Sequence, residues 1–469
     1  MAKRKSKKNS GSYEIKVTKK NWKLFLVLLI ILVIAGAAYG AYYYISEKKR
    51  MAALSSSSSE VTSSEVISSS ETGSSSNNST VSSSISSSSS SQTSDTSLSS
   101  QALVYHNLSF NFLELGVYNA GDCTYIKAGD VDILIDAGAK YASVETLEKY
   151  IDTYCTDKKL EYVIATHAHE DHIAGMSGGT AKDGILYKYA VGTIIDFATS
   201  GTTSNVYQYY TAARDYAVSK GAVHYTAKQC FDETDGAKKE YVLDEESNIT
   251  MDIIYNAYYY SYPGDENNCS VCTLFNYGAH HFLLTGDLEK EGEGAMATYY
   301  DGTSPEKTLP HCDLFKAGHH GSPTSSNESL LSKITPDICC VCCCAGGSEY
   351  TPTEDNTFPS QAFINRIAKY TSAVYVTSQI DEEASRTAGE FVFKSMNGNI
   401  NVKCDGLTTS VSASNNLTKL KDSAWFNETV YLDSNGNICS GAKKKDFFTS
   451  ASSGVTARVR RTWPADGKQ

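Results

Sequence analysis

The sequence predicts an α+β fold, with helices layered against β-sheets, over residues 101–408. Short apolar runs bounded by Gly, Asp and Asn recur along these residues, as strands and their turns do. Between such runs, apolar residues recur at helical spacing after Ser143 and again after Ser204, and serine is a favourable N-cap. Because sheets and amphipathic helices must each bury an apolar face, this alternation predicts layers of helix on sheet.

The first 100 residues precede this fold as segments of different composition. Nine Lys and Arg lie in residues 1–23, which we expect to be a basic cytoplasmic tail, and residues 24–45 are apolar and uncharged. Twenty-two such residues are enough to cross a bilayer. The basic flank predicts a single-pass cell-membrane anchor with the N-terminus inside and the rest extracellular. The alternative is a secreted protein, released by signal cleavage near Ala35-Gly36-Ala37.

The segment after the anchor, residues 46–100, is dominated by serine and contains no aromatic residue. Such a tract cannot bury enough apolar area to offset the entropy of ordering it. We therefore expect a disordered linker that holds the folded part away from the membrane.

Charge limits the choice of partner. Residues 51–469 carry 30 basic and 51 acidic residues, a net charge of −21. Because such a surface repels polyanions, no stable nucleic-acid complex is expected.

Thirteen cysteines, an odd number, include five in the apolar run 339–344. Paired zinc-ligand spacings are missing, so this run is interpreted as a buried strand in which cysteine acts as a small hydrophobe. Cys269 and Cys272 form a lone Cys-x-x-Cys, which is a weak motif without a redox-domain context.

The apolar runs place the elements in order. Predicted strands lie at residues 104–117, 121–126, 131–138, 162–165, 272–275, 281–287, 313–318 and 339–344. The first predicted helix presents Val144, Leu147, Ile151 and Tyr154 on one face, and the second ends at Gly221. Residues 409–469 are a C-terminal extension, expected to be partly disordered, whose basic residues Lys443–Lys445, Arg458, Arg460 and Arg461 are a candidate contact with wall polymers.

Three histidines and a carboxylate crowd the loop after strand 162–165, at His167, His169, Asp171 and His172. Neutral imidazole and ionised carboxylate are ligands for zinc or a neighbouring first-row metal. His167 and His169, two apart on extended backbone, share one direction and are expected to bind one ion. Asp171 and His172, where the chain turns into a helix, are expected to face a second ion.

Other polar residues lie in or after predicted strands. Asp136 closes a strand, and composition alone would make it a turn residue or a helix cap. Asp287 ends the strand that begins at His281, where a carboxylate can bridge two cations. Lys316 is expected to be a solvated edge residue, and His280 and His281 ordinary surface residues.

The His-x-His-x-Asp-His motif at residues 167–172 resembles the signature of the metallo-β-lactamase superfamily. With Gly121-Asp122, Leu284-Thr285-Gly286-Asp287 and His319-His320-Gly321-Ser322, the chain resembles the branch that includes the extracellular domain of the competence protein ComEC. It is also similar to teichoic-acid phosphocholine esterases. The resemblance covers about residues 104–405 and does not include the ComEC channel. It implies a four-layer αββα sandwich.

The resemblance also implies two divalent metal ions, with zinc favoured and manganese as an alternative. The implied ligands are His167, His169, Asp171, His172, Asp287 and His320. Asp171 and His319 are the implied catalytic residues, with His319 contacting substrate, although the choice between His319 and His320 as ligand stays open. Asp136 and Asn268 are implied to support the metal loops.

Two departures from the family pattern weaken these expectations. The usual third histidine before Asp287 is missing, and Asn267–Ser270 occupies its region. Tyr350-Thr351-Pro352 stands where ComEC-like sequences often have Gly-His-Pro, which removes a candidate acid.

The sequence therefore predicts a membrane-anchored extracellular hydrolase with two metals, acting on phosphodiesters of a cell-wall polymer or a nucleic acid. A hydrolase of another ester or amide, such as a lactam, is one alternative. A surface binding protein with a degenerate metal site is the other.

Overall fold

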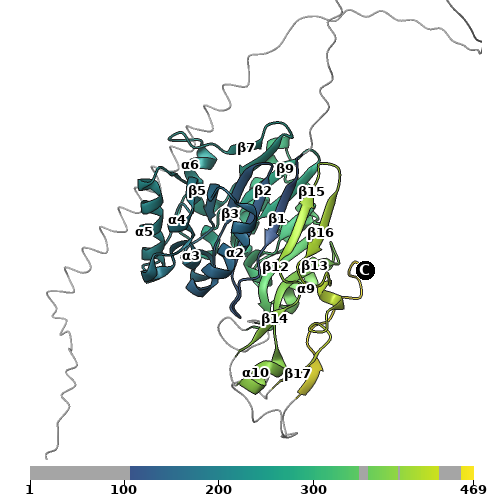
Figure 1. The fold of residues 1–469 in the computed structure, drawn as a ribbon. Coiled ribbons are helices and arrows are strands. Elements are labelled where there is room, and N and C mark those ends of the chain that lie inside the picture. The colour runs from purple at the N-terminus through teal and green to yellow at the C-terminus, as the bar shows by residue number, and fades with distance from the viewer. Residues whose placement is uncertain (1–105, 348–356, 389–390, 433–455) are drawn as a thin grey trace, which may run out of the picture. The chain divides into compact units, whose positions relative to one another are not determined.

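Two eight-stranded mixed sheets form the centre of the protein in a computed structural model (Figure 1). The structure describes residues 106–347, 357–388, 391–432 and 456–469. The predicted tail, anchor and linker, and Tyr350–Pro352, lie outside these residues. Within the described ranges, no helix has the length and apolar composition needed to span a bilayer.

The first sheet has the strand order β16-β15-β1-β2-β3-β4-β5-β6. Its strands are β1 (Leu108–Phe112), β2 (Thr124–Ala128), β3 (Val131–Ile135), β4 (Lys159–Ala165), β5 (Ala190–Asp196), β6 (Val223–Thr226), β15 (Ile400–Cys404) and β16 (Thr409–Ala413). Pairing is antiparallel from β16 to β3 and parallel from β3 to β6. The parallel strands therefore bring their carboxyl ends to one edge of the sheet.

The second sheet has the order β14-β13-β12-β11-β10-β9-β8-β7. Its strands are β7 (Glu240–Asp244), β8 (Ile249–Ile253), β9 (Thr273–Tyr277), β10 (His280–Leu284), β11 (Leu314–Lys316), β12 (Ile338–Ala345), β13 (Ala373–Ile380) and β14 (Phe393–Ser395). Strands β10 to β13 run parallel, and the flanking strands are antiparallel. This sheet therefore also has a parallel centre.

Aromatic side chains join the two sheets face to face. Phe110 of β1 stacks on Phe282 of β10 with ring centroids 4.9 Å apart, and it meets Phe275 of β9 edge-on at 5.2 Å. All three rings are fully buried in one core cluster. The predicted sandwich of two mixed sheets is thereby confirmed.

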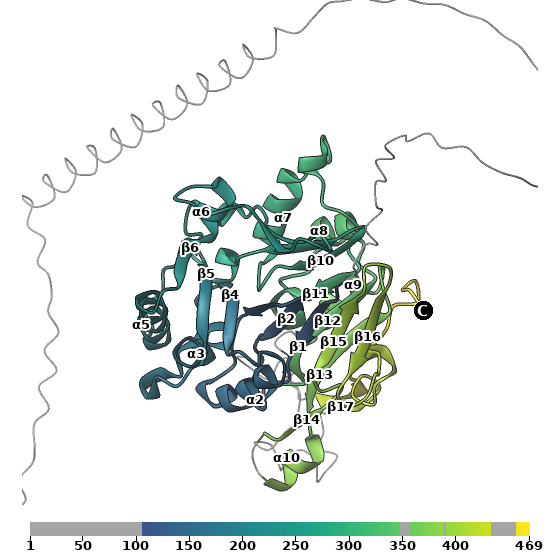
Figure 2. The same ribbon diagram turned by 45° about the horizontal axis from the view of Figure 1, so that its top comes forward.

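Helices cover the outer faces of the two sheets (Figures 1 and 2). The main ones are α2 (Val144–Tyr154), α3 (Glu170–Ser177), α4 (Ile185–Lys188), α5 (Asn205–Ser219), α6 (Ala227–Asp232), α7 (Lys290–Tyr299), α8 (Glu328–Ile334), α9 (Gln361–Ile367) and α10 (Glu382–Ala388). Leu147 and Ile151 of α2 join the core that contains the first sheet. Met296, Leu330 and Phe363, from α7, α8 and α9, form a second core with the second sheet.

The cysteine-rich run is strand β12, as predicted. Cys339 and Cys343 join the core under the helices, whereas Cys340 and Cys342 join the core between the sheets. This alternation is the two-residue period of a strand buried on both faces. All described cysteines are buried and free of disulfides, including the Cys269–Cys272 pair.

Two expectations about local structure are wrong. The first strand ends at Phe112 and does not continue to residue 117, because Gly116 adopts a left-handed φ of +71° and the chain turns away. Tyr154 does not lie on the buried face of α2 but is 48% exposed, since it is the last residue of the helix.

The predicted boundary at residue 408 does not coincide with an edge of the fold. Strand β16 lies beyond it and pairs with β15, and Trp425 joins the second core. Arg460 and Arg461 have only 1% of their surface exposed. The hypothesis that these two arginines contact wall polymers is therefore wrong, and Lys443–Lys445 lie outside the described residues.

Candidate metal centre

Loops from both sheets meet at the carboxyl ends of parallel strands. The loop after β4 leads into α3 and carries the first histidine cluster. In the second sheet, β10 ends three residues before Asp287, and the turn after β11 carries His319 and His320. Both histidines have positive φ, +45° and +53°, which turns the chain sharply at the end of the strand.

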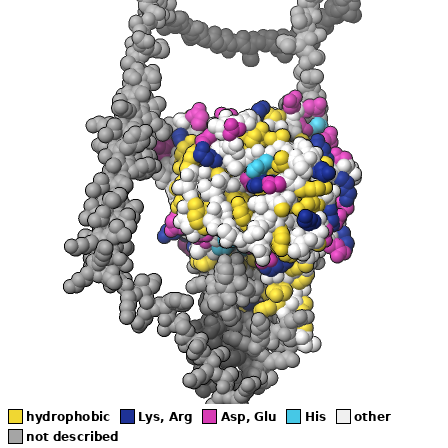
Figure 3. Space-filling model, turned by 90° about the vertical axis from the view of Figure 1, so that its left-hand side faces the viewer, with side chains coloured by type: hydrophobic (Ala, Val, Ile, Leu, Met, Phe, Trp, Pro, Cys, Tyr) yellow, Lys and Arg dark blue, Asp and Glu magenta, His cyan; other side chains and the backbone are white. Residues whose placement is uncertain are grey.

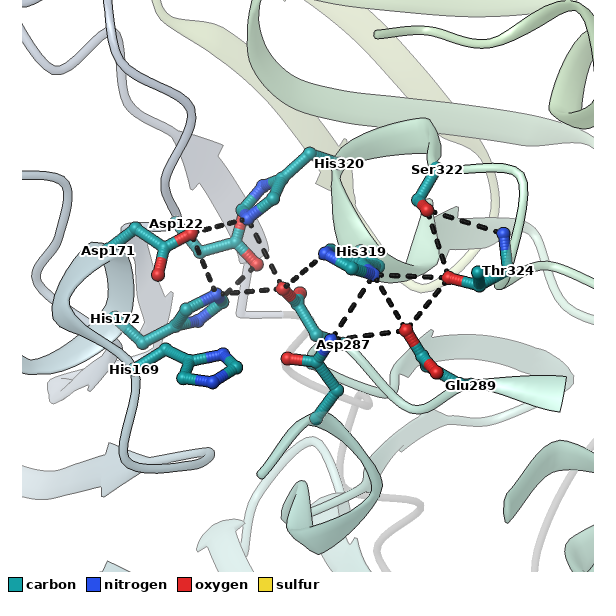
Figure 4. Close-up of polar contacts among 12 residues, drawn as sticks. Asp122, His169, Asp171, His172, Asp287, Glu289, His319, His320, Ser322 and Thr324 are labelled. Carbon is teal, nitrogen blue, oxygen red and sulfur yellow. Dashed lines mark hydrogen bonds and ion pairs between the residues drawn. The ribbon is translucent and has the colours of Figure 1, made fainter. Parts of the chain in front are cut away.

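Four of the six predicted ligands form one cluster, which consists of Asp171, His172, Asp287 and His320 (Figure 4). Their ligand atoms all lie within 4.8 Å of one another. Oδ2 of Asp287 lies 3.1 Å from Nε2 of His172 and 3.3 Å from Nε2 of His320. Nε2 of His320 also lies 3.1 Å from Oδ2 of Asp171. Two imidazole nitrogens and two carboxylate oxygens therefore converge, which fits zinc or manganese.

His167 and His169 form a separate pair. Nε2 of His167 lies 3.0 Å from Nδ1 of His169, and the His167 ring centroid lies 4.1 Å from that of His172. In the part of the chain that the structure describes, no third His, Cys, Asp or Glu joins these two in a compact ligand group. This pair offers fewer protein ligands than the four-residue cluster.

Asn268 supports the backbone near the cluster and does not replace the missing histidine. Its Oδ1 accepts hydrogen bonds from the backbone N–H groups of Glu289 and Gly292, each at 3.2 Å. This side chain therefore fixes the start of α7, directly after Asp287.

Asp136 lies directly behind His172. Its carboxylate accepts the Thr166 backbone N–H at 2.8 Å and the Thr166 hydroxyl at 2.7 Å, and Oδ2 lies 2.8 Å from Nδ1 of His172. With Nδ1 held in this way, Nε2 of His172 faces the cluster. Gly138 lets the backbone approach closely, because a Cβ there would meet the carbonyl oxygen of Asp171 at 1.5 Å.

Lys316 and Asp122 complete the surroundings of the cluster. Lys316 is only 2% exposed, forms an ion pair with Asp122, and places Nζ 3.5 Å from Oδ1 of Asp287. The expectation of a solvated lysine is wrong, because β11 lies between β10 and β12 and has no exposed edge. In the sequence Asp122 stands out only as part of the Gly121-Asp122 motif, and its burial beside Lys316 and His320 reveals its position in the site.

Acidic groups hold protons on the two imidazoles of the metal-free cluster. Burial alone would lower the pKa of His172 and of His320, but Asp287 and neighbouring carboxylates outweigh it and raise both pKa values well above the usual value. A metal ion would therefore have to displace these protons.

Burial alone would raise the pKa of Asp287, but the charges of His172, His320 and Lys316 outweigh it and lower the pKa far below its usual range. Burial, aided by the neighbouring imidazoles His172 and His169, lowers the pKa of His167 and keeps it neutral. Ionised carboxylates and a neutral imidazole are the forms that bind metal.

His319 lies beside the cluster and outside the four-residue group. Its Nε2 is 4.0 Å from Oδ2 of Asp287, whereas its Nδ1 faces Oε1 of Glu289 at 3.2 Å. The geometry therefore brings His320 into the cluster and leaves His319 at its rim.

A cavity of about 350 Å³ opens next to Asp171 and His169. Its lining includes Tyr118, Lys140 and Phe358, and Lys140 forms an ion pair with Glu170. The volume lies at the lower end of the range for small-molecule sites.

A model of the metallo-β-lactamase superfamily matches residues 118–181. Recombination protein 2 of Haemophilus influenzae is 26% identical over 260 residues, covering 55% of this chain and 26% of that protein. ComE operon protein 3 of Bacillus subtilis is 34% identical over 74 residues, covering 16% of this chain and 9% of that protein. The chain thus spans a small part of both relatives.

Among solved structures, the metallo-β-lactamase fold protein YhfI of Bacillus subtilis aligns with a TM-score of 0.31 and 11% identity. The alignment covers 57% of this chain and 95% of that protein.

The two mixed sheets, the ligand cluster and the match over residues 118–181 together indicate a metal-binding, hydrolase-like domain similar to the metallo-β-lactamase superfamily. Within the superfamily the chain resembles the ComEC-type branch, which both curated relatives represent.

Proposed function

We propose that this protein is a metal-dependent phosphodiesterase with two divalent ions. The observation that carries the proposal is the convergence of Asp171, His172, Asp287 and His320 within 4.8 Å. These four residues would hold one ion, and His167 with His169 would hold the other. A bound divalent metal supplies Lewis acidity and activates water at neutral pH.

The protein's own groups complete the site around a substrate phosphate. Asp136 orients His172, and the charge of Lys316 stabilises the buried carboxylates of Asp122 and Asp287. His319 presents Nε2 at the rim of the cluster, within reach of a substrate oxygen.

Cavity size and charge favour a small phosphodiester unit of a cell-wall polymer. The cavity of about 350 Å³ accommodates one such unit, and its wall carries the ion pair of Lys140 with Glu170. The net charge of −21 on residues 51–469 opposes a long nucleic acid. Acidic and basic side chains are also interspersed on the face shown in Figure 3. Another ester or amide remains the alternative substrate class.

We also propose an extracellular location, with residues 24–45 as a single membrane anchor. Support comes from the uncharged apolar run and the nine basic residues before it. The serine-rich linker would then allow the folded domain to reach wall polymers.

Metal content and hydrolysis test the proposal together. We expect the purified full-length chain to hold about two zinc or manganese ions by elemental mass spectrometry and to hydrolyse bis-p-nitrophenyl phosphate. Asp287→Ala should lose metal and at least about a hundredfold in turnover. His311→Ala, an exposed histidine paired with Asp337, is the matched control.

A different result would favour the surface binding protein. The absence of a compact third ligand for His167 and His169 among the described residues is the observation behind this second candidate. If metal-saturated wild type turned over substrate no faster than the double variant H167A/H169A, the hydrolase would be rejected.

A further inference from the structure

Glu289, two residues after Asp287, gathers three donors around one carboxylate oxygen (Figure 4). Its Oε1 accepts the Thr324 hydroxyl at 2.8 Å and the Asn267 side-chain amide at 3.2 Å, and it lies 3.2 Å from Nδ1 of His319. The Glu289 side chain is only 16% exposed. A surface carboxylate with no role rarely meets three fixed donors, so this arrangement requires an explanation.

The backbone around Glu289 is held as firmly as its side chain. Its N–H donates to Oδ1 of Asn268 at 3.2 Å, and the next residue, Lys290, donates its N–H to the Thr324 carbonyl at 3.0 Å. The start of α7 is thereby joined to the loop that follows the His319-His320 turn. These hydrogen bonds therefore fix the position of Glu289 relative to His319.

The two ring nitrogens of His319 face different surroundings. Nδ1 lies 3.2 Å from Oε1 of Glu289, 3.3 Å from the Thr324 hydroxyl and 3.4 Å from the Asn267 amide nitrogen. Because the carboxylate, the nearest of the three, only accepts hydrogen bonds, this geometry favours a proton on Nδ1. Nε2 points the other way, 4.0 Å from Oδ2 of Asp287, which belongs to the ligand cluster. The Phe358 ring, with its centroid 5.8 Å away and inclined at 67°, limits rotation of the imidazole from the side.

We propose that Glu289, with Thr324 and Asn267, is a positioning residue that holds the His319 ring with Nε2 directed at the substrate oxygens beside the metal cluster. The proposal rests on the proposed function, because it assigns His319 a contact with the substrate of that reaction. Glu289 itself touches neither the substrate nor the four cluster ligands and acts through His319.

Measuring the tautomer of His319 tests the proposal even if the protein has no hydrolytic activity. In ¹⁵N-histidine-labelled full-length protein, we expect the His319 ring, assigned by its loss in His319→Ala, to be protonated at Nδ1. Glu289→Gln should remove that preference, whereas Glu291→Gln, an exposed neighbour in α7, should leave it intact. A wild-type ring protonated only at Nε2 would overturn the proposal without the need for any variant.

Kinetics with zinc-loaded protein supply the second test. Glu289→Gln should lower kcat for bis-p-nitrophenyl phosphate about tenfold to a hundredfold, with metal content and KM unchanged. In the His319→Ala background the same substitution should have no further effect, because the two residues act as one unit. An equal loss in both backgrounds, or a loss of metal, would show that Glu289 does not act through His319.

These experiments separate the two proposals. If wild type showed no hydrolysis, the proposed function would fail, whereas the tautomer measurement would still decide whether Glu289 orients His319. A hydrolytically active wild type whose His319 tautomer did not respond to Glu289→Gln would instead reject the positioning role alone.

Discussion

Lys316 is a buried cation beside the candidate metal ligands. Its ammonium faces Asp122 and Asp287, and its Nζ also donates to the Gly286 carbonyl at 3.2 Å. Burial alone would lower the pKa of Lys316, but Asp122 and Asp287 outweigh it and raise the pKa above its usual value. Lys316 therefore stays charged. Its positive charge offsets part of the negative charge of Asp122 and Asp287, which a bound metal would otherwise have to neutralise alone.

Removing this charge should destabilise the metal-free protein. Lys316→Met leaves Asp122 buried without its cation, which costs about 3 kcal/mol in the free energy of unfolding. Urea denaturation in a chelator measures the change, and Lys290→Met, an exposed lysine at the start of α7, is the control. Adding Asp122→Asn to Lys316→Met should recover part of the loss. Unchanged stability in Lys316→Met would contradict the assigned role.

At the scale of elements, α7 holds the loop that carries the second histidine pair. Glu293 of α7 is fully buried and accepts the backbone N–H groups of Ser326 and Asn327 at 2.6 and 2.7 Å. Arg366 of α9 donates from the other side to the carbonyls of Ser325 and Ser326, at 2.7 and 2.8 Å. Two helices thus fix residues 325–327, in the loop that follows the His319-His320 turn.

Glu293 should make stability depend on pH. Burial raises its pKa to about 7 from an ordinary 4.5, although Asn327 and Ser326 oppose the shift. Because the folded protein binds this proton more tightly than the unfolded chain, the stabilisation is complete below pH 4.5 and is lost as the pH rises through 7. The contribution is about 3 kcal/mol.

Urea denaturation in a chelator between pH 4.5 and 8 measures this dependence. We expect Glu293→Gln to flatten the fall in stability over this range, while Glu291→Gln keeps the wild-type slope. Identical slopes for wild type and Glu293→Gln would show that the carboxyl does not titrate as described.

At the scale of the whole molecule, the last residues of the chain belong to the second core. Arg461 donates to the carbonyls of Thr357 and Pro359 at 2.6 and 2.8 Å, and Thr462 exchanges two hydrogen bonds with the Gln361 side chain. The ring of Trp463 lies 6.2 Å from that of Phe426. This segment therefore supports α9 and, through α9, the loop after His320.

Deleting residues 456–469 should weaken the entire domain. Loss of the Arg461 hydrogen bonds and the Trp463 contact should lower the free energy of unfolding by about 2–4 kcal/mol. Differential scanning calorimetry should show one cooperative transition at a lower Tm. An unchanged Tm would mean that the segment only rests on the surface. A second transition that is present in the wild type and lost in the variant would mean that the segment forms an independent unit.

The sequence by itself determined the local features. Strand β12, helices α2 and α5, the His167–His172 motif, Asp287 and the His319-His320 turn follow from apolar periodicity, N-caps and ligand spacing, because these patterns lie within a few residues of one another. The resemblance extended this information to Asp136 and to the sandwich of two sheets.

Only the tertiary structure decided which of these groups meet. Glu289 and Lys316 carried no local signal of function, since a charged residue at a helix start or a strand end is usually solvated. They acquire their roles because two sheets, each with parallel strands at its centre, pack with their loops together. This packing brings Asp122, in the loop before β2, against Lys316 of β11. The same packing places His320 in the cluster and leaves His319 at its rim, a choice that two adjacent histidines in a sequence cannot reveal.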